Sequence, residues 1–304
     1  VSSTTAVLCN GGNNGIITAT TTGGTGSITY QLQPTNQTNS TGIFTSLTAN
    51  TYTITATDVI GCSVTTQVVI AAPSILTWTS NTATNILCNG GNNGSISTAA
   101  TGGTGTITYQ LQPSNQSNTT GSFTTLNANT YTITATDINN CSITTQLTIS
   151  EPPTIVWNTP SITQVLCNGG TNGSITTTVS GGTGTISYQL QPTNQTNTTG
   201  IFATLGANTY TITATDINNC STTTQVTIIE PSPLQVTNIS TTAPTCVPGN
   251  DGSMTVTASG GTTTYQYNIN GGTNQGSNVF SNLNSGTYTI QVTDANNCTA
   301  TSTQ

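Results

Sequence analysis

Short runs of alternating apolar and polar residues, separated by turns rich in glycine and asparagine, extend along the whole chain. Residues 131–136, for example, read YTITAT. This two-residue alternation is typical of β-strands, and no segment shows the spacing of an amphipathic helix. Over residues 73–151 the pattern predicts strands at 75–87, 95–100, 106–112, around Phe123 and Leu126, at 131–136 and at 142–149.

The predicted set of strands occurs four times. The first cysteine of each set lies in LCNGGNNG, LCNGGNNG, LCNGGTNG and TCVPGNDG, at 79-residue intervals, and the second follows NTYTITATD three times and GTYTIQVTD once. Such self-similarity is the signature of a repeat protein. Proline-containing segments mark the boundaries, so we predict repeats over 1–72, 73–151, 152–230 and 231–304.

About seven short strands in each repeat predict an all-β fold of four tandem β-sandwiches, of the immunoglobulin-like or PKD-like kind. Because proline cannot continue a strand ladder and stiffens a linker, we expect the four repeats to form an extended rod. Trp78 and Trp157 are expected to pack in a core or at a junction. One tyrosine in each repeat stands at the start of the sixth strand, where immunoglobulin domains have a tyrosine corner: Tyr52, Tyr131, Tyr210 and Tyr288.

The composition excludes several classes of function. The Thr- and Asn-rich chain has no Lys, Arg or His and seven acidic residues, for a formal charge of -7. Without cations it cannot neutralise phosphates, so no nucleic-acid partner is expected. Without His or Lys it lacks the usual general base, the Schiff-base amine and the commonest metal ligand, so we predict that it is not an enzyme and has no resident cofactor. No stretch approaches the roughly 18 apolar residues of a membrane span.

The eight cysteines are the candidate site residues, and they point to disulfides in an oxidising, extracellular setting. Zinc is disfavoured because no closely spaced Cys/His cluster exists. In an immunoglobulin-like strand order, the first cysteine of a repeat lies in the A–B loop and the second in the F–G turn, at the opposite pole. Strands of six to eight residues would hold them about 20 Å apart, whereas a disulfide needs Cα atoms within about 7 Å.

Two pairings remain open. The preferred one crosses the junctions and joins an A–B loop to the F–G turn of the next repeat, which leaves Cys62 and Cys246 for neighbouring repeats: Cys9–Cys141, Cys88–Cys220 and Cys167–Cys298. The alternative lies within each repeat and requires another strand order: Cys9–Cys62, Cys88–Cys141, Cys167–Cys220 and Cys246–Cys298.

The run CNGGNNGSI, then GGTGTITYQ, then NTYTITATDINNCS and an EP boundary resembles the SprB-type repeat of Bacteroidetes cell-surface adhesins. The resemblance covers essentially all four repeats. It implies a place in a long tandem array at the cell surface, with links to gliding motility and type IX secretion, and it supplies no catalytic residue. Repeats 1 to 3 depart from the family pattern in lacking its usual Pro-Pro after the Gly-Gly turn.

One aspartate precedes each F–G turn: Asp58, Asp137, Asp216 and Asp294. We expect these carboxylates to cap their own turns. The less favoured hypothesis is calcium at the repeat junctions, with Glu151 or Glu230 nearby, although calcium usually needs several carboxylates. The polar stretches 34–42, 113–121 and 192–200 are expected to be solvated connections, although their Asn-x-Ser/Thr sequences would also suit glycan attachment.

We therefore predict a structural segment of a secreted, repetitive cell-surface fibre or adhesin stalk, stiffened by disulfides. The alternative is an array of carbohydrate- or surface-binding adhesin modules. The expected partners are further repeats of the same chain, with lateral copies in a fibre or surface glycans as the other candidates.

Overall fold

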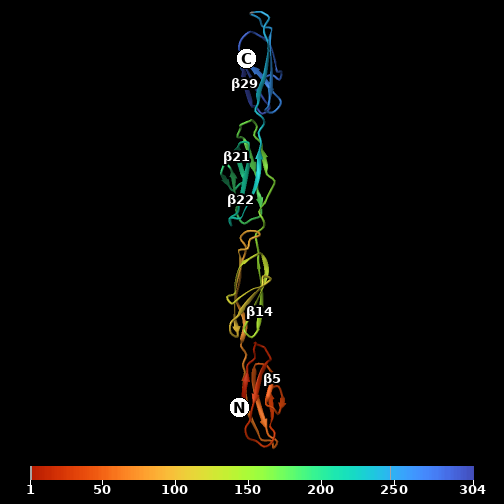
Figure 1. Cartoon of the computed structure of the whole chain (residues 1–304), viewed down its shortest axis with the longest axis vertical. Coiled ribbons are helices and arrows are strands. Elements are labelled where there is room, and N and C mark those ends of the chain that lie inside the picture. The colour runs from red at the N-terminus through yellow and green to blue at the C-terminus, as the bar shows by residue number, and fades with distance from the viewer. Residues whose placement is uncertain (1, 247) are drawn as a thin grey trace. The chain divides into compact units, whose positions relative to one another are not determined.

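The computed structural model describes residues 2–246 and 248–304, and these residues form strands and turns without any helix (Figure 1). They are grouped in two compact units, Val1–Glu151 and Pro152–Gln304. The border between the units coincides with the predicted boundary between the second and third repeats. The fourfold division within the units stays a prediction, and we keep its numbering, so that the first unit contains repeats 1 and 2.

Repeat 1, red to orange in Figure 1, consists of two sheets in which all neighbouring strands are antiparallel. One sheet has the order β1 (Ser2–Thr5), β2 (Gly15–Ala19) and β5 (Ile43–Leu47). The other has the order β4 (Gln37–Asn39), β3 (Thr29–Gln33), β6 (Asn50–Thr57) and β7 (Ser63–Ile70). In the letters used for immunoglobulin domains, β1, β2 and β5 are strands A, B and E, and β4, β3, β6 and β7 are strands C′, C, F and G. A sheet of A, B and E facing a sheet of C′, C, F and G is the arrangement of an immunoglobulin-like sandwich.

Repeat 2 has the same two sheets. The first has the order β12 (Ser122–Leu126), β9 (Gly94–Gly103) and β8 (Ser74–Thr84), and the second β11 (Gln116–Asn118), β10 (Thr108–Gln112), β13 (Asn129–Thr136) and β14 (Ser142–Ile149). The A strand thus ends at Thr84, three residues before the predicted end. The short strand β11 lies in a stretch that we expected to be only a solvated connection.

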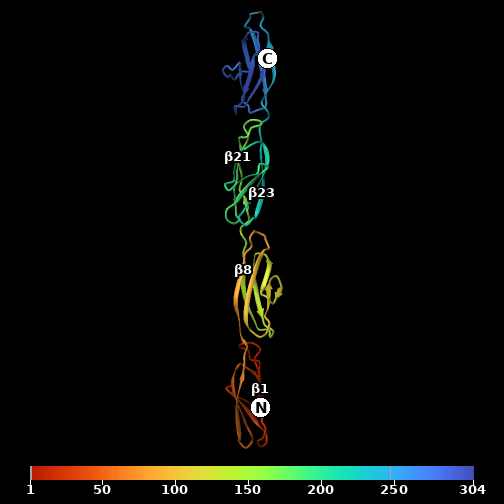
Figure 2. The same cartoon turned by 90° about the vertical axis from the view of Figure 1, so that its left-hand side faces the viewer.

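The second unit follows a similar plan, in which the first two strands of repeat 3 are interrupted and the second sheet of repeat 4 has three strands. Repeat 3 has the sheets β16 (Ser161–Thr163), β17 (Gly173–Thr176) and β21 (Ile201–Leu205); β20 (Gln195–Asn197), β19 (Ser187–Gln191), β22 (Asn208–Thr215) and β23 (Ser221–Ile228); and the pair β15 (Val156–Trp157) and β18 (Val179–Ser180). Repeat 4 has the sheets β24 (Gln235–Thr242), β25 (Gly252–Ser259) and β27 (Val279–Leu283); and β26 (Gln266–Ile269), β28 (Thr289–Thr293) and β29 (Thr299–Thr303). Strands β21 and β23 are labelled in Figure 2.

Each repeat has its own hydrophobic core between its two sheets. The strand NTYTITAT shows why: its alternate residues Tyr131, Ile133 and Ala135 are buried, while the threonines between them face outward. The predicted tyrosine corner is confirmed in all four repeats. Each tyrosine hydroxyl donates to the backbone carbonyl four residues earlier, at 2.9 to 3.1 Å, on Thr48, Asn127, Gly206 and Asn284.

Trp78 lies over the core of its own repeat and not at a junction. Its ring is tilted against that of Tyr109, with centroids 6.3 Å apart, and its Nε1 donates to the carbonyl of Thr144 at 3.4 Å. Trp157 packs against the core of repeat 3 in the same way, 6.2 Å from Tyr188. Of the two predicted locations, the structure therefore selects the core.

Candidate functional site at the junction between repeats

The aspartate before each F–G turn is the anchor of that turn. In repeat 2, Asp137 is buried, and its Oδ1 accepts hydrogen bonds from the backbone N–H groups of Asn139 and Cys141, both at 2.9 Å. Its Oδ2 accepts from Thr104 N at 2.8 Å, which ties the Gly-Gly turn to the F–G turn. The same three contacts recur around Asp58, Asp216 and Asp294. The predicted capping role is confirmed, and it fixes the position of the following cysteine.

These hydrogen bonds also favour the charged carboxylate. The N–H of Thr25, followed by those of Cys62, Ile60 and Gly61, holds the pKa of Asp58 below its usual value, against an opposing effect of desolvation. Desolvation raises the pKa of Asp137, but hydrogen bonds from Thr104, Cys141 and Asn139 together lower it further, so the net shift is downward. An ionised aspartate with its oxygens already committed to backbone N–H groups is a structural cap.

The A–B loop that carries the first cysteine is held just as firmly. In repeat 2, Asn93 Oδ1 accepts from Leu87 N at 3.2 Å, and Glu151 Oε2 accepts from Gly90 N at 2.6 Å. In repeat 3, Glu230 accepts from Gly169 N at 2.6 Å and from the Nδ2 of Asn168 at 3.0 Å. The boundary glutamates therefore hold the A–B loop of their own repeat.

Disulfides join an A–B loop to an F–G turn of the following repeat within each unit. In the first unit, Cys9 of repeat 1 is bonded to Cys141 of repeat 2, with Cα atoms 5.6 Å apart. In the second unit, Cys167 of repeat 3 is bonded to Cys298 of repeat 4, also with Cα atoms 5.6 Å apart. Both Cα separations fall in the ordinary range for a disulfide. These two bridges have the pairing that we preferred across the junctions.

The within-repeat alternative is therefore wrong. Each of its four pairs contains a cysteine that is bonded to a cysteine of another repeat: Cys9–Cys62, Cys88–Cys141, Cys167–Cys220 and Cys246–Cys298. The physical reason lies in β7. The A–B loop of repeat 1 is tied to the end of that strand by a hydrogen bond from Val7 N to Ala71 O, whereas Cys62 immediately precedes its start. Eight residues of strand span about 26 Å, which no disulfide bridges.

Cys88 and Cys220 are also in disulfide linkage, and Cys62 and Cys246 are exposed free thiols. A Cys88–Cys220 bridge would link the two units, and that pairing stays a prediction. The free thiols are the two cysteines for which the junction pairing provides no partner among the predicted bridges.

Two asparagine side chains reinforce the junction inside each unit. In the first unit, Asn139 Nδ2 of repeat 2 donates to Leu8 O of repeat 1 at 3.3 Å, and Asn10 Nδ2 donates to the carbonyl of Pro73 at 3.0 Å. In the second unit the corresponding bonds run from Asn296 to Leu166 O at 3.0 Å and from Asn168 to Pro231 O at 3.1 Å. We predicted no role for these asparagines from the sequence. Two of them belong to the Asn-Asn pair that precedes the second cysteine, and the other two directly follow the first cysteine, so their repetition could have indicated a role. Each of these junctions therefore has a proline linker, a covalent bridge and two side-chain hydrogen bonds.

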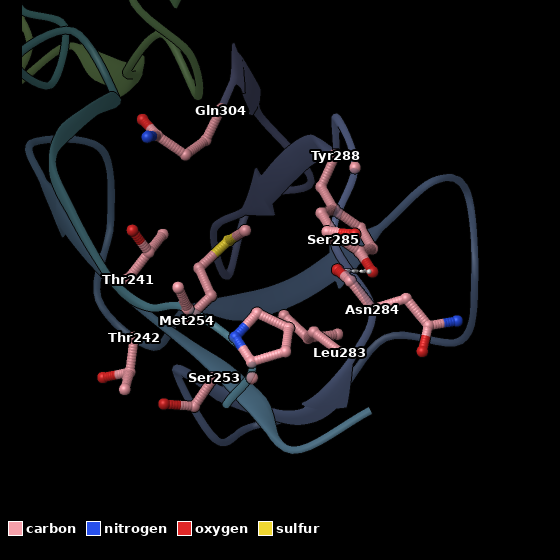
Figure 3. Close-up of a pocket in the computed structure, with 13 residues that line it drawn as sticks. Thr241, Thr242, Ser253, Met254, Leu283, Asn284, Ser285, Tyr288 and Gln304 are labelled. Atoms are coloured by element: carbon pink, nitrogen blue, oxygen red, sulfur yellow. Dashed lines mark hydrogen bonds between the residues drawn. The ribbon is translucent and has the colours of Figure 1, made fainter. Parts of the chain in front are cut away.

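The described residues contain no group of three or more His, Cys, Asp or Glu side chains placed to hold a metal ion. A hollow of about 210 Å³ lies in repeat 4, and none of its 13 lining residues is acidic or a cysteine. Figure 3 shows Met254, Leu283 and Tyr288 among the residues around it. Calcium at the junctions stays the less favoured hypothesis.

The fold and its junctions define a protein of tandem immunoglobulin-like β-sandwich repeats in which disulfides bridge successive repeats. The family model "SprB repeat" matches residues 1–37, 80–116, 159–195 and 238–274. The chain therefore carries four SprB repeats and belongs to the family of proteins built from them, as its sequence motifs predicted. Each match includes the first cysteine of its repeat.

Comparison with other proteins adds no closer identification. No curated protein matches the chain in sequence. Similar solved structures include "Sidekick-1 immunoglobulin domains 1-5", at 10% identity and a TM-score of 0.35, covering 99% of this chain and 76% of that one. Another is described as "Ca2+-stabilized adhesin helps an Antarctic bacterium reach out and bind ice", at 15% identity and a TM-score of 0.34, covering 100% and 97%. Domains 1–6 of the surface layer protein SbsC match at 11% identity and a TM-score of 0.27, covering 91% and 49%. With TM-scores below 0.5, these three similarities indicate nothing about the function of this chain.

The described part of the chain contains no helix of the length and apolarity that crossing a membrane requires.

Proposed function

We propose that the chain is a structural segment of a secreted, repetitive cell-surface fibre or adhesin stalk. The observation that carries this proposal is the disulfide that crosses the junction between two repeats, Cys9–Cys141 in one unit and Cys167–Cys298 in the other. A bridge in this position does nothing for a binding site, but it restricts the hinge between two domains. Membership of a surface-repeat family and the use of disulfides both support a location outside the cell.

In this proposal the four repeats form a stiff, extended segment, and the units are linked by a Cys88–Cys220 bridge equivalent to the other two. Further repeats are the expected partners, joined through Cys62 and Cys246 in the same geometry. We propose no catalytic activity, since the aspartate before each F–G turn already accepts hydrogen bonds from backbone N–H groups of that turn. Roles in gliding motility and type IX secretion remain expectations from the family.

Electron microscopy of the purified chain with and without reductant tests the proposal. We expect extended particles with regular beads, and a broader distribution of angles between neighbouring beads after reduction. A Cys62→Ser variant, which removes a thiol outside any bridge, is the matched control and is expected to resemble the wild type. A collapsed globule, or bead angles that do not respond to reduction, would contradict the structural role.

The second candidate is an array of carbohydrate- or surface-binding modules. Its support is the outward face of the second sheet, where threonine hydroxyls meet across strands at 2.9 Å for Thr130 and Thr148 and at 3.0 Å for Thr209 and Thr227. Repeated, uncharged hydroxyl rows would suit hydrogen bonding to sugars. Reproducible, saturable binding of the chain to a glycan array would favour this candidate, and its absence would leave the structural role.

A further inference from the structure

One Asn-Gly pair in the second unit shares a single carboxylate. In the A–B loop of repeat 3, the backbone N–H of Gly169 donates to Glu230 Oε2 at 2.6 Å, and Asn168 Nδ2 donates to Glu230 Oε1 at 3.0 Å. All three residues are exposed, so water reaches them. The carboxylate therefore contacts the two nitrogen atoms whose bonds change when an Asn-Gly pair forms a succinimide.

The geometry of this contact suits that reaction. Glycine has no side chain, so its backbone nitrogen can closely approach the side-chain carbonyl carbon of the residue before it. A general acid–base group must lie about 2.6–3.2 Å from the atom whose proton it moves. Glu230 meets this distance both at Gly169 N, the nitrogen that attacks, and at Asn168 Nδ2, the nitrogen that leaves. Because both nitrogens contact one carboxylate, a proton can pass between them through that group.

The chain contains a matched Asn-Gly pair without the carboxylate. Asn10-Gly11 of repeat 1 stands two 79-residue intervals earlier, and both loops are closed by a 2.9 Å hydrogen bond from the second glycine to the carbonyl of the cysteine. Asn10 Nδ2 donates to the linker carbonyl of Pro73 at 3.0 Å, and the corresponding bond to Pro231 O measures 3.1 Å. Ala72 stands where repeat 3 has its glutamate. The two loops therefore share their contact with the linker and differ in the acidic group.

We propose that Asn168 is a self-modification site, at which Glu230 acts as the general acid–base in the loss of the side-chain amide. Gly169 N attacks Asn168 Cγ, and the N–Cγ bond of a cyclic succinimide forms as the Cγ–Nδ2 bond breaks. Glu230 accepts the proton of the Gly169 N–H and passes it to the departing amine, which leaves as ammonia. Water then opens the ring to an aspartate or an isoaspartate, and no group is oxidised or reduced. The reaction occurs once in each chain and is not enzymatic turnover.

The reaction loosens the junction between repeats 3 and 4. The new carboxylate cannot donate the hydrogen bond that Asn168 Nδ2 makes to Pro231 O, and it lies beside Glu230, so two like charges face each other. The loop also carries Cys167, whose bridge to Cys298 keeps the repeats linked. This inference is independent of the structural role proposed above, since the chemistry needs only the loop and the glutamate of repeat 3.

The test follows the conversion of amide to acid at each Asn-Gly pair by mass spectrometry. The full, disulfide-bonded chain is incubated at neutral pH, and samples taken over time are digested with pepsin under acidic conditions. We expect Asn168 to convert at least about tenfold faster than Asn10, since a positioned acid–base group contributes about 10²–10⁴-fold. Equal rates at the two sites, or a faster rate at Asn10, would overturn the proposal.

Two variants distinguish proton transfer from simple clamping of the loop. Glu230→Gln keeps an oxygen that accepts from Gly169 N but cannot take its proton, so conversion at Asn168 should fall at least about tenfold. An unchanged or higher rate in this variant would mean that the glutamate only holds the loop. Ala72→Glu supplies repeat 1 with the missing carboxylate at an exposed position, and it should raise conversion at Asn10 at least about tenfold. An unchanged rate at Asn10 in that variant would contradict the assignment.

Discussion

Cys9 and Cys141 stand 132 residues apart in sequence and 5.6 Å apart in space, measured between their Cα atoms, and they belong to different repeats. Each is held in place by its own turn. Asp137 Oδ1 accepts the backbone N–H of Cys141 at 2.9 Å, and Cys9 lies in a loop closed by a bond from Gly12 N to its carbonyl at 2.9 Å. The bridge therefore joins two preorganised turns.

Removing this bridge should destabilise the first unit. In the chain-entropy model, a crosslink that closes a loop of this length stabilises the folded state by about 5 kcal/mol, and measured values are typically about 2–4 kcal/mol. We expect the double variant Cys9→Ser/Cys141→Ser to melt several degrees lower than the wild type in calorimetry under oxidising conditions. Cys62→Ser is the control and should not shift the transition. An unchanged melting temperature for the double variant would show that the bridge contributes nothing to the fold.

Thiol chemistry should distinguish the bridged cysteines from the free ones. A maleimide added to the native, unreduced chain is expected to label Cys62 and Cys246, because both thiols are exposed and unpaired. Non-reducing peptide mapping should then recover Cys9 linked to Cys141 and Cys167 linked to Cys298. The same map tests the predicted Cys88–Cys220 bridge. A peptide containing Cys9 linked to Cys62 would refute the junction pairing and the strand order behind it.

The capping aspartates make stability depend on pH in a defined direction. The folded-state pKa of Asp58 and Asp137 is below the usual value of 3.8, so each carboxylate stabilises the fold above that value. This stabilisation is lost as the pH falls through the lowered folded pKa. Melting temperatures should thus stay level from pH 7 to about pH 5 and fall below about pH 4.

An Asp137→Asn variant isolates one of these caps. The amide keeps an oxygen for Asn139 N and Cys141 N but turns a donor toward the N–H of Thr104, so the variant should melt lower at pH 7. It should also lose less stability than the wild type between pH 5 and pH 2. A parallel loss in both proteins would assign the acid sensitivity to other groups.

Much of this structure follows from local patterns. The alternation in NTYTITAT predicted the strand, and the position of the tyrosine near its start predicted the corner hydrogen bond. The pole at which each cysteine lies followed from strand order alone. Short-range periodicity and strand direction were enough because each repeat folds around its own core.

Other features depend on contacts that no pattern shows. The strand β11 has the polar sequence QSN, and it is a strand because its backbone pairs with β10 over Tyr109↔Asn118 to Leu111↔Gln116. The bond from Gly90 N to Glu151 joins residues 61 positions apart, and the sequence suggested only that this glutamate lies near a junction. The location of Trp78 was left open because a tryptophan in the first strand of a repeat, close to the proline linker, suits either a core or an interface.

Single-molecule force spectroscopy of the full chain, pulled from its two ends, tests most directly whether the bridges transmit tension across the junctions. With the disulfides intact, the residues between Cys9 and Cys141 and between Cys167 and Cys298 cannot extend. Reduction should release separations of 132 and 131 residues, or about 430–480 Å of contour length for each bridge at roughly 3.3–3.6 Å per residue. We predict that this length appears only after reductant is added. Equal unfolding lengths with and without reductant would contradict the account.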